Sequence, residues 1–301
     1  MSDYGGSQSQ RRILVCADDF AHSRETSQVI LDLLDRGKLN GTSCLAESGA
    51  WVELGGVLRQ LARARPSLAV GLHLNLTERF AQQAPGSLGP PNRVALARLL
   101  MTPGRGRGMA LYQRFAAQWD LFVRYFGRPP DFVDGHQHVH LAPAARRPLM
   151  RLLATKSFSG WIRQCRTNSN RFIPKRMLLD RLSRRFERKT IGYDVTFNSG
   201  FGGLRRFDEG EGVTTIWRTD LAAMPTDGVL MVHPGADVSG CLTDPIGRFR
   251  VQEARLLAGG VMQEALDEFG FLLDRPLGRH GAPPACGLQQ QRPEQPNVAH
   301  G

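Results

Sequence analysis

Lysine is scarce in this 301-residue sequence, which contains four lysines although its formal net charge at pH 7 is +11. Arginine therefore supplies 35 of the 39 basic residues. A basic balance of this size can indicate a nucleic-acid partner. The basic residues are spread along the chain, however, except between Arg171 and Lys189, where apolar residues recur at helical spacing. We therefore expect no nucleic-acid partner. We interpret the basic stretch as the solvated face of a helix, with binding of an acidic partner as the alternative.

Paired cysteines and long apolar runs are also absent from the sequence. Its five cysteines form no C-x-x-C motif and have no regular spacing, which argues against a zinc ribbon or a disulfide framework and suits a reducing compartment. The apolar run at residues 13–17 is too short for a signal peptide, and no run approaches the roughly 18 apolar residues of a membrane span. We therefore expect a cytoplasmic protein with no membrane-spanning segment.

What the sequence does contain is an alternation of short apolar runs and amphipathic segments. The apolar runs predict strands at residues 13–17, 42–46, 68–76, 132–133, 161–165, 229–232 and 271–273. The amphipathic segments predict helices at residues 23–36, 52–65, 111–126, 148–155, 171–188, 217–223 and 250–269. Because strands that alternate with helices form parallel sheets, we expect an α/β fold. About seven strands favour a single-domain, irregular and incomplete (β/α) barrel.

The sequence contains no internal repeat and no clear linker between domains. We assign the barrel domain to residues 11–274, a polar disordered arm to residues 1–10 and a disordered Pro/Gln-rich tail to residues 275–301. Residues 81–108 are rich in Pro and Gly and predict a loop or lid, interrupted by a short helix near residues 94–101. The glycine-rich stretch 197–203 predicts a flexible loop. It contains no G-x-G-x-x-G motif after a strand, so it implies no dinucleotide site.

Three of the eight histidines lie at alternate positions behind an aspartate, as Asp134, His136, His138 and His140. Imidazole is the commonest protein metal ligand, so the cluster favours a metal site over a histidine-rich surface strand. In an extended backbone all four side chains would share one face. Same-face neighbours lie about 6.5–7 Å apart, too far for three rings to bind one ion. One histidine, or two with a bend, can ligate, and the other ligands must come from elsewhere in the chain.

Polar residues also gather at the carboxyl ends of the predicted strands. Asp18-Asp19 follows the first strand, His73 lies near the end of the third, Arg163 lies on the fifth, and His233 follows the strand at 229–232. Two adjacent acids are costly to bury unless a cation neutralises them, and a helix N-cap needs only one of them. In parallel α/β folds this edge of the sheet carries the functional site. These residues are therefore candidates for one site shared with the histidine cluster.

Four segments of the chain together resemble a known family. They are Ala17-Asp18-Asp19-Phe20, Gly71-Leu72-His73-Leu74-Asn75-Leu76-Thr77, Asp134-Gly135-His136-Gln137-His138-Val139-His140 and His233-Pro234-Gly235. In order and spacing they are similar to the motifs of the YdjC-like carbohydrate deacetylases, which include chito-oligosaccharide deacetylases and deacetylases linked to hopanoid biosynthesis. The resemblance covers about residues 11–273. It implies a (β/α) barrel-like fold, one divalent metal ion (magnesium or zinc) and removal of N-acetyl groups from an acetylated sugar or glycolipid. Formation of a homodimer is left open.

The resemblance also implies roles for individual residues. By position, the metal ligands fall on Asp19, His73 and His136, the general base on Asp18 and the general acid on His233. A metal held by one carboxylate and two imidazoles keeps open positions for water and for the acetyl carbonyl, which suits amide hydrolysis. The same ligand set resembles a non-haem iron site, but nothing in the sequence suggests an oxygenase cosubstrate.

We expect His138 and His140 to contact the substrate or a metal ligand and not to bind the metal themselves, and we assign Arg163 the same role.

The family usually has glycine at the position of Ala21. If that position requires a positive φ, alanine costs about 1 kcal/mol there.

Two alternative functions stay open. One is a metal-dependent hydrolase of another amide or of a phosphoester, and the other is a non-catalytic family member whose basic helix binds an acidic partner.

Overall fold

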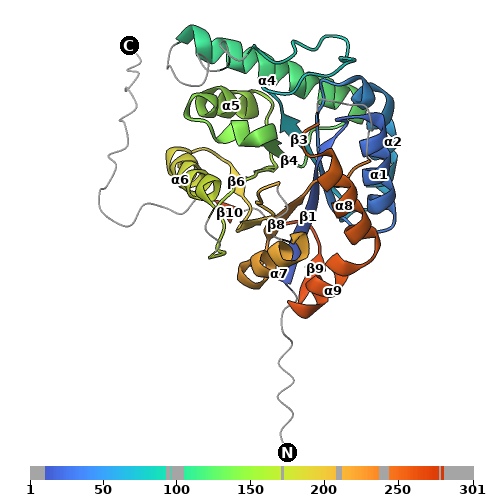
Figure 1. The fold of residues 1–301 in the computed structure, drawn as a ribbon. Coiled ribbons are helices and arrows are strands. Elements are labelled where there is room, and N and C mark those ends of the chain that lie inside the picture. Colours follow the sequence, from blue (N-terminus) through green and yellow to red (C-terminus); the bar gives the residue numbers. More distant parts are fainter. Residues whose placement is uncertain are drawn as a thin grey trace, which may run out of the picture.

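The computed structural model describes residues 11–92, 96, 105–170, 173–207, 212–236, 244–277 and 279–280. The predicted arm at 1–10, residues 281–301 of the tail predicted at 275–301 and most of the helix predicted near 94–101 lie outside these residues. The described chain forms one curled, almost entirely parallel sheet with helices packed around its outside (Figure 1). The predicted irregular (β/α) barrel is thus confirmed.

All seven predicted strands are present in the sheet. They are β1 (Arg11–Phe20), β2 (Gly41–Cys44), β3 (Ala69–Leu74), β4 (Phe132–Gly135), β5 (Trp161–Ile162), β8 (Gly228–Val232) and β9 (Phe271–Leu273). Three strands of two residues each were not predicted, namely β6 (Thr196–Phe197), β7 (Phe201–Gly202) and β10 (Arg279–His280). The strand order is β10-β6-β5-β4-β3-β2-β1-β8-β7, and β9 pairs with β1. Among the strand pairs that the structure describes, β10 and β6 are antiparallel and the other pairs are parallel.

The connection between β6 and β7 explains why the sheet curls. These strands lie towards opposite ends of the strand order, yet only residues 198–200 separate them in sequence. Four backbone steps span at most about 14 Å, so the two ends of the sheet must approach one another. The side chain of Asn198 bridges the gap, because its Nδ2 donates to Gly200 O at 2.7 Å and its Oδ1 accepts from Gln164 N at 2.8 Å. The predicted flexible glycine loop is therefore the closing segment of an open barrel.

Each predicted helix is present, although those predicted from residues 111, 148 and 217 begin four to six residues earlier and the last is divided in two. The described α-helices are α1 (Arg24–Asp35), α2 (Gly49–Ala64), α4 (Arg105–Phe126), α5 (Pro143–Thr155), α6 (Pro174–Lys189), α7 (Val213–Ala223), α8 (Gly247–Ala258) and α9 (Val261–Glu268). The single helix predicted at 250–269 is wrong, because the chain breaks at Gly260, whose φ is +92°. Among the helices that the structure describes, none is long and apolar enough to cross a membrane.

The chain stays in the fold beyond residue 274, where the tail was predicted to begin. Arg275 Nη1 lies 3.0 Å from Asp131 Oδ1, and the Leu277 backbone N–H donates to Asp227. β10 then pairs with β6. The described part of the barrel domain therefore extends to residue 280.

β1 is the central strand and determines where the functional residues gather. It lies between β2 and β8, and its residues from Ile13 to Phe20 are buried on both faces. β3 and β4 follow on one side in parallel register, with His73 opposite Asp134. Because the neighbouring strands run in one direction, their carboxyl ends meet at one edge of the sheet.

The carboxyl end of β1 is strongly bent. Asp19 and Ala21 have positive φ angles of 68° and 69°, respectively. His22 N donates to Asp19 O at 2.9 Å, and Ala21 N donates to Ser27 Oγ at 2.9 Å. The positive φ that would favour glycine at position 21 is thus present, and the chain keeps the bend with alanine.

Replacing Ala21 by glycine should raise the free energy of unfolding by about 0.5–1 kcal/mol. Relief of the Cβ penalty at positive φ exceeds the extra conformational entropy that glycine gives the unfolded chain. Urea denaturation of the two proteins measures the difference. Ala62→Gly within α2 is the control, and it should lower stability by up to about 1 kcal/mol. A similar loss in both variants would show that Ala21 is not strained.

Candidate metal centre and active site

The carboxyl edge of the sheet opens into a cavity of about 270 Å³. The five residues predicted as metal ligands, base and acid all line it: Asp18, Asp19, His73, His136 and His233. Most of the other lining residues are polar or charged, but Phe207, Met231 and Ile246 add apolar surface. Convergent polar groups in a cavity that also offers apolar surface are typical of a small-molecule site.

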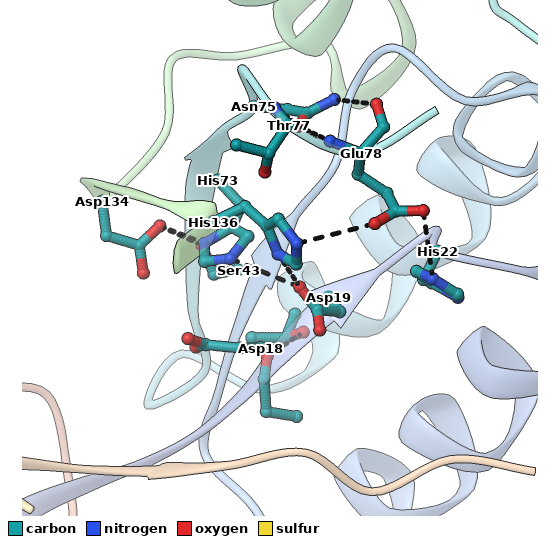
Figure 2. Close-up of polar contacts among 12 residues, drawn as sticks. Asp18, Asp19, His22, Ser43, His73, Asn75, Thr77, Glu78, Asp134 and His136 are labelled. Atoms are coloured by element: carbon teal, nitrogen blue, oxygen red, sulfur yellow. Dashed lines mark hydrogen bonds and ion pairs between the residues drawn. The ribbon is translucent and has the colours of Figure 1, made fainter. Parts of the chain in front are cut away.

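Three side chains from separate segments converge beside the end of β1 (Figure 2). Asp19 Oδ1 lies 2.9 Å from His136 Nδ1 and 3.4 Å from His73 Nε2. Two ligands that each bind one ion at about 2.1 Å lie roughly 3.0–3.4 Å apart at octahedral or tetrahedral angles. The separations therefore fit a divalent cation held by Asp19, His73 and His136.

His73 is fixed on its far side by Asp134. The Nδ1 atom of His73 lies 2.7 Å from Asp134 Oδ1, and the Ser43 hydroxyl donates to the same oxygen. Burial alone would lower the pKa of His73, but the charge of Asp134 and hydrogen bonds to Asp134 and Asp19 raise it to about 10. Without a cation the ring is therefore protonated at neutral pH, and a cation would displace the proton from Nε2.

Asp19 is ionised although it is almost completely buried. Burial alone would raise its pKa, but the neighbouring His136 and Arg250 hold the pKa well below its usual range. Arg250 Nη2 donates to Asp19 Oδ2 at 2.8 Å, which leaves Oδ1 facing the two histidines. The carboxylate is thus oriented for ligation.

Asp18 is paired with Arg163. Arg163 donates from Nη1 to Asp18 Oδ2 at 2.6 Å and from Nη2 to Asp18 Oδ1 at 2.8 Å. Arg163 Nη2 also lies 2.8 Å from Asp134 Oδ2. Asp18, His73 and Asp134 form a second group with metal-ligand spacing. Because Arg163 already occupies oxygens of both carboxylates in that group, whereas Asp19 Oδ1 faces two histidines, we favour the set that contains Asp19.

The prediction that Asp134 and the three histidines share one face is wrong. β4 ends at Gly135, and the next residues form a 3₁₀ turn, η1 (His136–Leu141). Gln137 and His138 within it have positive φ angles of 52° and 61°. The backbone is therefore not extended, and His136 is the histidine of this cluster that faces Asp19.

His138 and His140 occupy different surroundings. His138 lines the cavity, and its Nδ1 lies 3.4 Å from Cys165 Sγ. His140 is completely buried and does not line the cavity; its Nε2 donates to Arg163 O at 2.8 Å. Burial lowers the pKa of His138 well below its usual value and that of His140 to about 4. Substrate contact by His138 stays a prediction, whereas His140 supports the backbone of Arg163.

His233 lies at the predicted edge and lines the cavity. Its backbone N–H donates to the carboxylate of Glu253, and its ring meets Phe207 edge-on with a centroid distance of 5.6 Å. Burial lowers the pKa of His233 to about 4, although the charges of Asp19 and Asp18 oppose the shift. The ring is therefore neutral at pH 7 in this state.

The sequence did not predict several residues of the site, among them His22, Glu78 and Arg250. Glu78 directly follows the segment Gly71–Thr77, so its place in the loop after β3 was a signal that could have been used. Arg250 lies on α8, 231 residues from Asp19, and no local pattern links the two. His22 is part of the bend after β1.

A profile of the YdjC-like protein family matches residues 12–272. A chitooligosaccharide deacetylase of Yersinia enterocolitica is 23% identical over 269 residues, which cover 88% of this chain and 97% of the relative. Chitooligosaccharide deacetylases of Escherichia fergusonii and Serratia marcescens are each 28% identical over 137 residues, covering 44% of this chain and 52% of each relative. The matched segment thus spans about half the length of these two relatives.

Among solved structures, a protein of Enterococcus faecalis V583 that is provisionally named for cellobiose-phosphate cleavage has a similar fold. The two structures superpose with a TM-score of 0.57 and 21% sequence identity, over 89% of this chain and 98% of the other. At this level of identity, the similarity establishes the fold alone.

Replacing His140 by asparagine should weaken the dependence of stability on pH below 6.5. An unfolded chain protonates histidine below about pH 6.5, whereas the folded protein keeps His140 neutral down to about pH 4. Acidification across this window therefore favours unfolding, and each such histidine contributes up to about 1.4 kcal/mol per pH unit. Asparagine can still donate to Arg163 O but does not titrate.

Urea denaturation between pH 4 and 6.5, with a chelator present, measures this slope for wild type and His140→Asn. The variant should have the shallower slope of unfolding free energy against pH. An unchanged slope would mean that folded His140 takes up a proton as readily as the unfolded chain.

Proposed function

The chain belongs to the family of YdjC-like proteins, and on that premise we propose that it is a metal-dependent hydrolase that removes an N-acetyl group from an acetylated sugar. The observation that carries the proposal is the convergence of Asp19, His73 and His136 in a cavity that Asp18 also lines. The names of the chitooligosaccharide deacetylases among the relatives support a sugar amide as substrate.

Asp19, His73 and His136 would hold the ion through one carboxylate oxygen and two imidazole nitrogens. This donor set suits zinc better than magnesium, which prefers oxygen ligands and water. When bound, a divalent ion would polarise the acetyl carbonyl and lower the pKa of a water molecule.

Asp18 is the proposed general base. Each carboxylate oxygen has two lone pairs, and Arg163 uses one on each oxygen. A free lone pair can therefore accept the proton of the attacking water. The two hydrogen bonds from Arg163 hold the carboxylate plane still, which orients this lone pair for the reaction.

His233 is the proposed proton donor to the leaving amine. Because burial keeps the ring neutral near pH 7, it can donate only after it takes up a proton. The proton that Asp18 removes from water is a source within the same cavity. One proton then leaves the water and one reaches the amine, and both side chains return to their starting states.

The remaining cavity wall suits a single sugar unit. The volume of about 270 Å³ is close to the lower end, roughly 300 Å³, of typical small-molecule sites. Phe207, Met231 and Ile246 offer apolar surface for the acetyl methyl group or a sugar face. We therefore propose that one N-acetylated sugar, from a chito-oligosaccharide or a glycolipid, occupies the cavity at a time.

A phosphoester hydrolase is the second candidate because of Arg205. This residue lines the cavity, and its Nε and Nη2 atoms are buried without a hydrogen-bond partner. Its Nε lies 3.3 Å from Glu253 Oε1, which balances the charge but leaves donors for an anionic group. Lys175 lines the same cavity.

Product analysis separates the two candidates. The metal-loaded protein should release acetate from at least one member of a panel of N-acetylated sugars, chito-oligosaccharides and glycolipids. It should release no phosphate from sugar phosphoesters. His136→Ala should lose bound metal and acetate release together. Phosphate release without acetate release would replace the proposed activity by the second candidate.

Asp18 and Asp19 should have separable roles. Asp18→Asn should keep stoichiometric metal but lose turnover by roughly 10²–10⁴-fold, as expected for loss of a general base. Asp19→Asn should lose metal as well, because a charged ligand is removed. Metal content by atomic absorption and acetate release should be measured on the same samples. Metal loss in Asp18→Asn together with metal retention in Asp19→Asn would exchange the two roles.

A further inference from the structure

We propose that Glu78 is a positioning residue for His136, holding this ring from its outer side as Asp134 holds His73. The inference rests on the proposed metal site and adds a residue that no motif of the chain assigned.

The imidazole rings of His73 and His136 are arranged in the same way relative to Asp19 (Figure 2). Each directs one nitrogen to Asp19 Oδ1, His73 through Nε2 and His136 through Nδ1. Each directs its other nitrogen to a second carboxylate. For His73 this is Asp134, at 2.7 Å from Nδ1, and for His136 it is Glu78, whose Oε2 lies 3.8 Å from Nε2.

The loop after β3 is built to hold Glu78 in this place. The Asn75 side chain accepts from Thr77 N at 3.0 Å and Glu78 N at 2.8 Å, and it donates to Glu78 O at 2.9 Å. Gln118 on α4 in turn fixes the backbone of Asn75, accepting from its N at 2.8 Å and donating to its O at 2.7 Å. Both backbone polar groups of Glu78 are therefore fixed, and its side chain reaches the cavity.

The second oxygen of the Glu78 carboxylate faces His22. His22 Nε2 lies 3.9 Å from Glu78 Oε1, on the side opposite to His136. His22 is held there by the bend after β1, through its backbone hydrogen bond to Asp19 O. The carboxylate thus spans two imidazoles, one from the bend that carries Asp19 and one from the metal-ligand set.

The chemistry of a ligating imidazole requires such an acceptor. If His136 ligates through Nδ1, the proton must lie on Nε2, and that N–H must be satisfied. The present separation of 3.8 Å is an ion-pair distance, and a shift of about 1 Å would bring it within hydrogen-bond range. The side chain of Glu78 is 24% exposed and that of Asp134 is not exposed. Loss of Glu78 should therefore weaken metal binding less than loss of Asp134 would.

Zinc binding to the metal-free, untagged protein tests the proposal. By calorimetric titration with Zn²⁺, Glu78→Ala should raise the Kd about tenfold, the lower end of the effect for an outer carboxylate. Glu78→Gln should raise it less, about threefold, because the amide oxygen still accepts from Nε2–H. Glu53→Ala is the matched control. Glu53 is an exposed glutamate paired with Arg24, and its removal should leave the Kd unchanged.

A Kd within twofold of wild type in Glu78→Ala would overturn the proposal. If Glu78→Ala does not fold, as judged by circular dichroism, the near-isosteric Glu78→Gln decides by the same comparison. Co²⁺ absorption adds a second readout, because a positioning residue leaves the ligand-field bands of Glu78→Gln in place. Shifted bands would place Glu78 among the ligands and overturn the positioning role.

These outcomes are separate from the test of the proposed function. Weaker zinc binding in Glu78→Ala with no acetate release from wild type would support the positioning role and overturn the deacetylase proposal. Acetate release from wild type with an unchanged zinc Kd in Glu78→Ala would support the deacetylase proposal and overturn the positioning role. Failure of the wild-type protein to bind zinc or cobalt would overturn both.

Discussion

The rest of the site depends on the ion pairs that the buried guanidinium of Arg163 makes. Asp18 and Asp134 lie on different strands, and Arg163 pairs with both of them while 1% exposed. Burying an unpaired ion costs several kcal/mol, and Arg163 supplies the cation that Asp18 pairs with, while Asp134 also pairs with His73. Arg250 does the same for Asp19 from the other side. With its carboxylates paired to cations in this way, the edge of the sheet can present ionised oxygens to a cavity.

The turn after β4 distributes the histidines among three tasks. Because Gln137 and His138 adopt left-handed backbone angles, consecutive histidines point in different directions instead of sharing a face. His136 faces Asp19, His138 faces the cavity and Cys165, and His140 binds the backbone of Arg163. The cluster therefore supplies a candidate ligand and also supports the cation that neutralises Asp18.

The sequence predicted the parts of the fold and site that depend on local pattern. Apolar runs located seven strands, and strand-end polarity identified residues that share the cavity. The extended backbone predicted after Asp134 was wrong, because positive φ at non-glycine residues has no sequence signal. The Gly259-Gly260 pair is a sequence signal for the break between α8 and α9, although the apolar pattern continues across it. Arg250 could not be predicted, since only the completed fold brings it to Asp19.

Charge balance links assembly of the site to closure of the barrel. Asp18 and Asp19 lie on the central strand, whereas their cations come from residues 145 and 231 positions further along the chain. Until β5 and α8 are in place, burial of both acids at the end of β1 would leave uncompensated charge. Arg163 is held by its backbone bond to Val133, and Gln164 beside it is held by Asn198, which spans the gap between the two ends of the sheet. The segment that closes the barrel thus also fixes the cation that the site requires, so the site is complete only when the fold is.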